Sequence, residues 1–260
     1  MRIARIVPVL ALVVGAALSG ATAQAAPAAP ERLASPVAPA VAAGPGTKDA
    51  WYSTTNGKLT YVNGNGENSE CSASSVNSPS GRVVVTAGHC VYRASTGGVS
   101  TNFTYHPGYH MGVRLPAFTV AYAEAAPQWL QGDYRHDYAF LVTNDLPDGR
   151  RLVDVAGAHG LIINSAYRQQ VHVAGYPYRM ENGEAQWYCW GTAGREAGTN
   201  RHTMGCDGND GASGGPWLRN YKPNGLGDVI SVTSTNPNKI NHAPYFGPEA
   251  KALYLSVANR

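Results

Sequence analysis

One serine, Ser213, stands in the run of small residues from Gly208 to Pro216, directly before an apolar segment. Glycine lets backbone N–H groups turn toward a common point and lets a substrate approach closely. A serine hydroxyl in such a turn becomes a nucleophile only beside a general base and an oxyanion-binding site. Glycine-rich turns with a serine are also common in surface loops, so this stretch alone does not identify a nucleophile. A general base for Ser213 has to be found elsewhere in the chain.

A histidine and a carboxylate each stand at the end of a predicted strand. The β-branched run Val83–Thr86 predicts a buried strand, and the small residues after it place His89 in a turn. Asp137 directly precedes the apolar run Tyr138–Val142, so it stands where a strand could bury it against an imidazole. Taken singly, such residues are more often structural or solvated. A catalytic role is indicated only because His89, Asp137 and Ser213 occur in the same chain.

The three residues lie in recognisable motifs. The order His, Asp, Ser resembles that of the trypsin/chymotrypsin-like serine proteases, over about residues 48–260. Within that family it is most similar to the secreted bacterial, glutamyl-endopeptidase-like branch. The residues that carry the resemblance are Thr86-Ala87-Gly88-His89-Cys90, Asp137-Tyr138-Ala139-Phe140-Leu141 and Gly211-Ala212-Ser213-Gly214-Gly215-Pro216. The resemblance implies an all-β fold of two packed six-stranded antiparallel Greek-key barrels, with a short C-terminal helix.

The resemblance also implies a role for each residue of a catalytic triad. Ser213 would attack the scissile carbonyl, His89 would be the general base and then the general acid, and Asp137 would orient the imidazole. The backbone N–H groups of Gly211 and Ser213 would bind the oxyanion. Asp133 is the rival acid, but Asp137 is preferred because the strand that would bury it follows at once.

Asp207 is the candidate specificity residue. It lies six residues before Ser213, where the trypsin branch carries the carboxylate at the base of its primary pocket. A buried carboxylate there would favour Arg or Lys before the cut; the alternative is that Asp207 only binds loop backbone amides. Thr233 and Ser234 are expected to border the pocket, and Asp210 could also reach it. No histidine is evidently placed to select glutamate.

Ala212 departs from the animal digestive members of the family. Those proteins carry an aspartate immediately before the serine, and it pairs with the N-terminus that activation frees. Ala212 cannot form that ion pair, and no Ile-Val-Gly-Gly-like start is present. Activation by a newly formed N-terminus is therefore not expected.

The N-terminal region divides into two predicted segments. Residues 1–25 have basic residues, then the apolar run Ile6 to Leu18, then small residues, which is the layout of a secretory signal peptide. Cleavage after Ala23 or Ala25 fits equally well. Residues 26–47 are mostly alanine and proline, which predicts an extended linker or a pro-segment that buries no core. The protease-like domain is predicted over 48–260.

Apolar, β-branched segments between Pro, Gly and Asn turns predict the strands of this domain. They are Lys58–Val62, Arg82–Thr86, Ala117–Ala121, Asp137–Val142, Gln170–Ala174, Gln186–Cys189 and Val229–Thr233. Near the end, Gly247-Pro248 predicts the start of a helix through Leu253, with proline at its first turn.

Four cysteines in an exported chain suggest two disulfides, which allow three connectivities. Cys71–Cys90 and Cys189–Cys206 are the expected pairs, because each pair flanks one local segment. The first is similar to the family's disulfide beside its histidine. Metal ligation is the alternative, but no Cys-x-x-Cys or His-Glu-x-x-His spacing is present, so no metal and no cofactor are expected.

Composition limits the possible partners. Charged residues make up 14% of the chain, the net charge is +3, and no dense basic cluster occurs, which argues against nucleic-acid binding. No segment after the leader is apolar for long enough to span a membrane. A secreted monomer that acts on protein or peptide substrates is expected.

The sequence also allows two alternatives to a secreted serine endopeptidase. Gly211-Ala212-Ser213-Gly214-Gly215 also fits the Gly-x-Ser-x-Gly pattern of α/β-hydrolases. In that fold an acid and a histidine must follow the serine, and Asp228 and His242 crowd too closely after it; Gly-Gly-Pro also starts a helix poorly. The second alternative is a non-catalytic, protease-like binding module, since fold alone does not imply activity. The presence of all three triad residues favours the enzyme.

Overall fold

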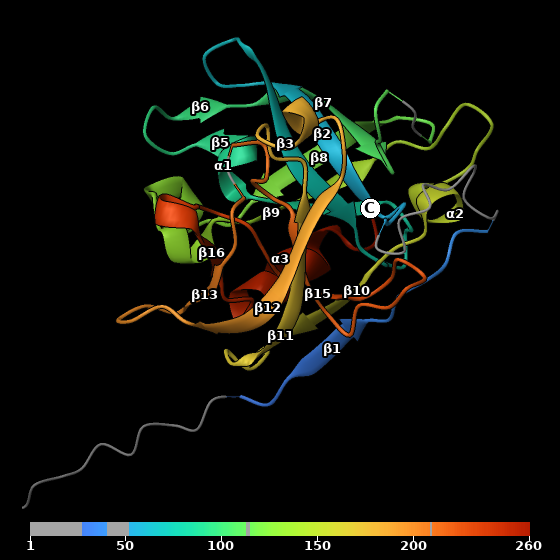
Figure 1. Cartoon of the computed structure of the whole chain (residues 1–260). Helices are drawn as coiled ribbons and strands as arrows, with labels where there is room; N and C mark the ends of the chain where they lie inside the picture. The colour runs from blue at the N-terminus through green and yellow to red at the C-terminus, as the bar shows by residue number, and fades with distance from the viewer. Residues whose placement is uncertain (1–27, 41–51, 113–114, 209) are drawn as a thin grey trace, which may run out of the picture.

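The computed structural model describes residues 28–40, 52–112, 115–208 and 210–260 (Figure 1). The predicted signal peptide, residues 1–25, lies outside these residues. Within them, no helix has the length and apolar character needed to cross a membrane.

Six strands close into a barrel in the first half of the chain. In order around the barrel they are β2 (Asn56–Val62), β3 (Asn68–Ser75), β4 (Val83–Thr86), β9 (Ala139–Thr143), β8 (Phe118–Ala125) and β7 (Thr101–Pro107). All neighbouring pairs are antiparallel, and β2 closes the barrel by pairing with both β3 and β7. A short pair, β5 (Tyr92–Arg93) with β6 (Gly98–Val99), projects beside it.

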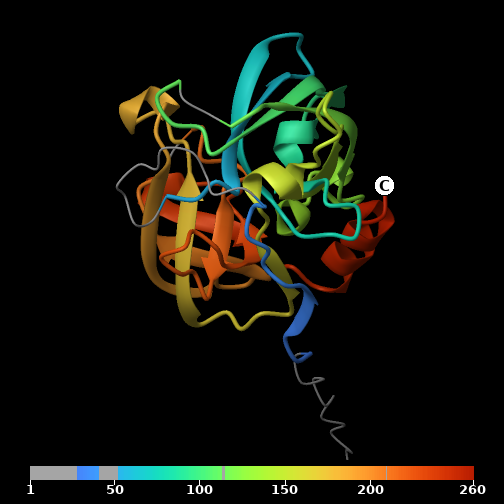
Figure 2. The ribbon, with the colours of Figure 1, turned by 90° about the vertical axis from the view of Figure 1, so that its right-hand side faces the viewer.

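Eight strands form the second sheet. In order they are β1 (Glu31–Ala34), β10 (Gly160–Ile163), β15 (Asp228–Val232), β14 (Pro216–Arg219), β11 (Gln169–Gly175), β12 (Trp187–Arg195), β13 (Arg201–Gly205) and β16 (Ile240–Pro244). In Figure 2 the cyan and green barrel strands lie above, and the yellow and orange strands of this sheet lie below and to the left.

The predicted all-β, two-barrel fold class is confirmed, with a difference in the second half. The sequence predicts a closed six-stranded barrel there, but the strands form an open eight-stranded sheet. Its two end strands, β1 and β16, do not pair with each other. One pair, β10 with β15, is parallel, while the others are antiparallel. The N-terminal strand β1 extends the ladder at the free edge of β10.

Among the described residues there are three α-helices, α1 (Gly88–Val91), α2 (Leu152–Ala156) and α3 (Pro248–Val257), and four short 3₁₀ helices, η1 (Trp129–Gln131), η2 (Tyr134–His136), η3 (Glu181–Gly183) and η4 (Pro237–Lys239). The predicted C-terminal helix is α3, and its proline stands at the first turn as expected. This helix packs on the first barrel, where the Tyr254 ring lies 5.8 Å from the ring of Phe140. Phe246, just before the helix, packs 5.1 Å from Tyr138 in the same core.

Both predicted disulfides are present. Cys71 of β3 is bonded to Cys90 of α1, and Cys189 of β12 is bonded to Cys206, which directly follows β13. The first ties the turn that carries His89 to the barrel wall. The second ties the hairpin β12–β13 at the start of the loop that carries Ser213.

The described part of the predicted linker, residues 28–40, contacts the domain. β1 pairs with β10, and the half-buried Leu33 and Ala34 pack against the main hydrophobic core. The chain thus continues the second sheet at positions where composition predicted an extended linker. That residues 26–47 are a linker or a pro-segment stays a prediction.

Candidate active site

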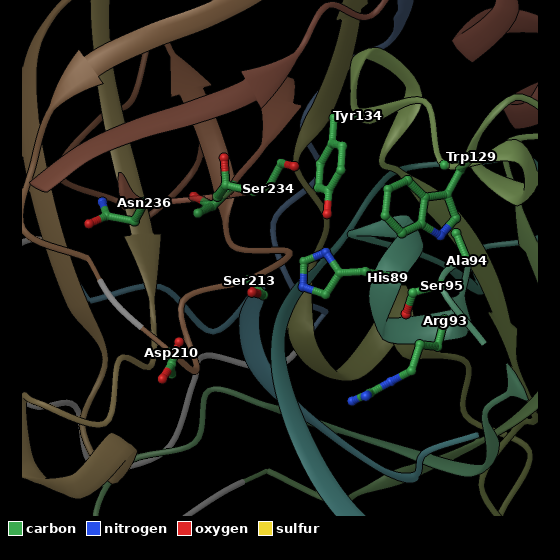
Figure 3. A pocket seen from close by; sticks show the side chains of 13 residues that line it. His89, Arg93, Ala94, Ser95, Trp129, Tyr134, Asp210, Ser213, Ser234 and Asn236 are labelled. Atoms are coloured by element: carbon green, nitrogen blue, oxygen red, sulfur yellow. The ribbon is translucent and has the colours of Figure 1, made fainter. Parts of the chain in front are cut away.

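His89 and Ser213 line the same cleft, whose volume is about 630 Å³. His89 comes from α1 on the first barrel, and Ser213 from the loop that precedes β14 in the second sheet. In Figure 3 the Ser213 side chain lies between the His89 ring and Asp210, while Trp129 and Tyr134 stand on the other side of His89. The cleft therefore combines a nucleophile candidate from one half with a base candidate from the other.

The barrel register brings His89 and Asp137 together. β4 and β9 run antiparallel with Thr86 opposite Ala139, so the end of one strand meets the beginning of the other. His89 follows the first strand and Asp137 precedes the second. The turn also requires Gly88, since a Cβ there would lie 2.7 Å from the ring of Trp129.

Asp137 receives three hydrogen bonds in a site closed to water. The His89 ring nitrogen Nδ1 lies 2.8 Å from Oδ2, and the His89 backbone N–H donates to Oδ1 at 2.8 Å. Ser234 Oγ donates to Oδ2 at 2.6 Å. The Asp137 side chain is 0% exposed, whereas that of His89 is 31% exposed toward the cleft.

These contacts set the pKa directions of the pair. Burial alone would raise the pKa of Asp137, but the charge and hydrogen bonds of His89 and the hydrogen bond from Ser234 outweigh it and lower that pKa. Burial alone would lower the pKa of His89, but the charge and hydrogen bond of Asp137 raise it above 6.5. The pair is thus built as an ionised carboxylate beside an imidazole of increased basicity.

Asp133, the rival acid, lies outside this arrangement. Its carboxylate caps the 3₁₀ turn η2 (Tyr134–His136), accepting from the backbone N–H of Arg135 at 3.0 Å. It also forms ion pairs with the side chains of Arg135 and His136. Hydrogen bonding to Arg135 is the largest influence and lowers the pKa of Asp133 to about 2. It is a turn-capping residue in this structure.

The loop before Ser213 is held by the first barrel. Ser72 Oγ donates to the carbonyl of Gly211 at 2.7 Å and accepts from the Tyr176 backbone N–H at 2.8 Å. The Ser72 backbone N–H donates to the carbonyl of Ser213 at 2.7 Å. Gly211 has φ +94°, which favours glycine, and a Cβ there would collide with the Tyr176 carbonyl. These contacts fix the carbonyl groups on one side of the loop.

The N–H groups of Gly211 and Ser213 have no acceptor among the described residues, as an oxyanion site requires before substrate binds. No hydrogen bond joins Ser213 Oγ to the His89 ring, although both are described and both line the cleft. Catalytic hydrogen bonds are often long in unliganded enzymes and tighten when substrate binds. The geometry therefore fits a resting arrangement in which nucleophile and base line one cleft and the two N–H groups are not engaged by other described residues.

Asp207 does not occupy the predicted position at the base of a pocket. Its side chain is 47% exposed and forms surface ion pairs with Lys239 at 3.1 Å and Arg179 at 3.6 Å. It is not among the residues that line the cleft. The structure therefore does not support Asp207 as a buried carboxylate that binds Arg or Lys.

Thr233 and Ser234 line the cleft, as does Asp210. Thr233 is held by the indole N–H of Trp217, which donates to its hydroxyl at 3.1 Å. Ser234 lines the cleft, and its hydroxyl also donates to the Asp137 carboxylate. The spacing of these residues in the sequence does not reveal this second contact.

Several residues that line the cleft were missed by sequence reasoning, and two of them act on His89. Trp129 lies with its ring 6.2 Å from that of His89 and is anchored by its N–H to the Tyr92 carbonyl at 2.7 Å. Arg93 lines the cleft, and its charge acts on His89. The only signal for Arg93 was its place four residues after His89, which is too weak to identify a cleft residue.

One group of potential metal ligands occurs among the described residues: Cys71, His89 and Cys90. The two cysteines are joined to each other in a disulfide, so their sulfur atoms are not thiolate ligands. The three residues lie close together because the disulfide is next to His89, and they do not form a metal site.

Comparisons with known proteins agree with this geometry. The model of the trypsin-like peptidase domain matches residues 71–222. The structure of the protease Anisep from Arthrobacter nicotinovorans is similar with a TM-score of 0.75 and 30% identity, over 81% of this chain and 98% of that one. The structure of a thermostable serine protease, AL20, from an extremophilic microorganism is similar with a TM-score of 0.74 and 28% identity, over 79% of this chain and 97% of that one. The search of curated proteins found no match.

A Glu endopeptidase is also similar, with a TM-score of 0.64 and 19% identity, over 84% of this chain and 99% of that one. At this identity the likeness shows the shared fold, so the predicted similarity to glutamyl-endopeptidase-like proteins holds at the level of architecture. The match to the domain model covers more than half of the chain, and it includes His89, Asp137 and Ser213. The chain belongs to the trypsin-like peptidase family.

Proposed function

We propose that this protein is a secreted serine endopeptidase that hydrolyses peptide bonds in proteins or peptides through an acyl-enzyme. The observation that carries the proposal is the buried Asp137 bound to His89 Nδ1 at 2.8 Å, in the cleft that Ser213 also lines. Membership of the trypsin-like peptidase family supports the same reaction class.

The first step forms the acyl-enzyme. Ser213 Oγ attacks the scissile carbonyl carbon while its proton passes to His89 Nε2, the ring nitrogen not held by Asp137. The ionised Asp137 stabilises the imidazolium that results. The carbonyl oxygen becomes an oxyanion and binds the N–H groups of Gly211 and Ser213. His89 then gives its proton to the leaving amine as the C–N bond breaks.

The second step regenerates the enzyme. Water enters, loses a proton to His89, and adds to the ester carbonyl, whose oxyanion binds the same two N–H groups. Collapse of this intermediate releases the acid and returns the proton to Ser213. Both steps need neutral His89 at the start, so activity should fall as the pH drops through the raised pKa of His89.

Two features support secretion. The leader, residues 1–25, has the layout of a signal peptide. The chain also contains two disulfides, which persist in oxidising compartments outside the cytosol. A monomeric state stays a prediction.

The test compares wild type with Ser213→Ala on peptides that vary the residue before the cut. We expect cleavage by wild type and a loss of kcat of about 10⁶-fold in the variant. A fluorophosphonate probe should label wild type at Ser213 and leave the variant unlabelled. Ser256→Ala, on the surface of α3, is the matched control and should keep wild-type activity and labelling.

The rival function is a non-catalytic binding module with the same fold. Folded wild type that neither cleaves any peptide of the panel nor reacts with the probe would favour the module. Since Asp207 is ion-paired on the surface, a marked preference for Arg or Lys before the cut would have to arise from other residues, of which Asp210 lines the cleft.

A further inference from the structure

Residues 30–40 bind the domain as an extended peptide, far along the chain from the residues they contact. β1 runs antiparallel to β10, with Glu31 opposite Ile163 and Arg32 opposite Ile162. Beyond β1, Val37 and Ala158 exchange two backbone hydrogen bonds of 2.8 Å each. Figures 1 and 2 show this blue segment along the margin of the second sheet. The segment therefore covers the backbone groups that β10 would otherwise expose as an edge strand.

An ion pair anchors the segment in the domain. The guanidinium of Arg32 binds both carboxylate oxygens of Asp228 in a two-pronged contact, and its second hydrogen bond measures 2.8 Å. The Asp228 side chain is 2% exposed, and it also accepts from Asn220 Nδ2 at 2.8 Å. In the described part of the chain, Arg32 is the cation in contact with this carboxylate.

Three other elements hold the segment by polar contacts. Asn77 Nδ2, next to β3, donates to the Ser35 carbonyl at 2.9 Å, and Lys251 of α3 pairs with Glu31 at 2.5 Å. The Ala40 backbone N–H donates to the carbonyl of Asp154 in α2 at 3.0 Å. The segment is thus bound by residues from both halves of the domain and from its C-terminal helix.

We propose that residues 30–40 are a clasp, a permanent peptide ligand of the protease domain that stays bound whether or not the chain is cut between residues 41 and 51. The ligand chemistry is that of β-strand addition, with main-chain hydrogen bonds for affinity and one arginine for specificity. Loss of the clasp takes from Asp228 the cation that binds both of its carboxylate oxygens, and breaking such an ion pair from one side is destabilising. Maturation therefore retains the clasp, in contrast to a pro-segment that is released.

The test uses the full chain in a Ser213→Ala background, so that no self-cleavage occurs. A recognition sequence for a site-specific protease is inserted between Gly44 and Pro45, and the protein is cut to completion. Gel filtration and native mass spectrometry should find the clasp fragment bound one to one. In Arg32→Gln the fragment should dissociate at least about tenfold faster. Arg150→Gln, which removes an exposed arginine paired with Asp148 elsewhere, should match the parent.

A comparison of two variants tests whether Arg32→Gln acts through its ion pair with Asp228 or by a general loss of stability. Asp228→Asn added to Arg32→Gln removes the uncompensated charge, so the double variant should unfold at a higher temperature than Arg32→Gln alone. Two results would overturn the proposal. One is a fragment that separates from the folded, cut parent during gel filtration. The other is a secreted, active protein that begins after residue 46 and carries no clasp peptide.

Discussion

Arg93 opposes Asp137 in its effect on His89. The charge of Asp137 raises the pKa of His89, whereas the charge of Arg93 lowers it. In Arg93→Gln the pKa of His89 should therefore rise further, and the acid limb of the kcat/KM profile should move to higher pH. Because Arg93 is exposed, the difference should shrink as salt is added.

The pH profile of Arg93→Lys is the control for this prediction, because lysine keeps the charge at the same place. Its acid limb should coincide with that of wild type at low salt. If Arg93→Gln and wild type share one midpoint at low ionic strength, Arg93 does not act on the catalytic base.

At the residue scale, the triad candidates and part of the cleft lining were predictable, and the fate of Asp207 was not. His89, Asp137 and Ser213 each stand in a motif with a strand or glycine turn beside it, and the structure brings the first two into contact and the third into the cleft that His89 lines. Of the two roles considered for Asp207, the buried pocket carboxylate is not found, because its spacing from Ser213 says nothing of Lys239, which lies 32 positions later and pairs with its exposed carboxylate.

At the element scale, β3 positions the loop of the nucleophile. Ser72→Ala removes the hydroxyl that binds both the Gly211 carbonyl and the Tyr176 N–H, leaving two buried groups unpaired. We expect kcat to fall by about 10- to 100-fold with little change in KM, because the displaced Gly211 N–H would stabilise the oxyanion less well.

Ser74→Ala is the matched control on the same strand. Ser74 is fully buried, and its hydroxyl has no partner among the described residues. Its kcat should equal that of wild type. Equal kcat values for Ser72→Ala and Ser74→Ala would show that the Ser72 hydroxyl does not position the loop.

The strands that sequence analysis found and missed differ in how they are stabilised. β4, β9 and β15 are β-branched or apolar runs, so their burial is visible in composition. β3 reads Asn-Ser-Glu-Cys-Ser-Ala-Ser-Ser, and two of its buried serines bind distant residues: Ser72 Oγ donates to the Gly211 carbonyl and Ser75 Oγ donates to the Gly157 carbonyl, both at 2.7 Å. β1 likewise depends on a strand and an aspartate more than a hundred residues away.

At the scale of the whole molecule, buried histidines connect stability to pH. His159 joins the two halves: its Nε2 lies 2.6 Å from Thr55 Oγ1 and 2.9 Å from Asn56 Oδ1, and its Nδ1 accepts from the Gly227 N–H at 3.2 Å. Burial lowers its pKa to about 3, and burial lowers that of His202 to about 4.

Acid should therefore destabilise the fold before its carboxylates titrate. Below pH 6.5 the unfolded chain binds protons at these two positions and the folded chain does not, so the free energy of unfolding falls as the pH drops. Each histidine should contribute a slope that approaches about 1.4 kcal/mol per pH unit. Urea unfolding at several pH values between 6.5 and 5 measures the total slope, to which His172 and His242, whose pKa values burial also lowers, add.

His159→Gln should flatten this slope, whatever its effect on absolute stability. Thr55→Val removes a hydrogen bond to the same ring but keeps the titrating group, so its slope should remain that of wild type. If the slope of His159→Gln equals that of wild type, the titration of His159 does not contribute to the pH dependence of the free energy of unfolding.

The C-terminal helix has a consequence for when the protein becomes active. Tyr254 packs on Phe140 and donates to the Asn77 carbonyl at 2.8 Å, while Val257 is fully buried in the main core. The first barrel, made early in synthesis, thus obtains part of its interior from α3, whose residues are made after both halves of the domain. The N-terminal half cannot complete its core before α3 has left the ribosome, so the fold around the cleft with His89 is completed only then. The order of synthesis itself delays proteolytic capacity until the chain has been made at least as far as Val257.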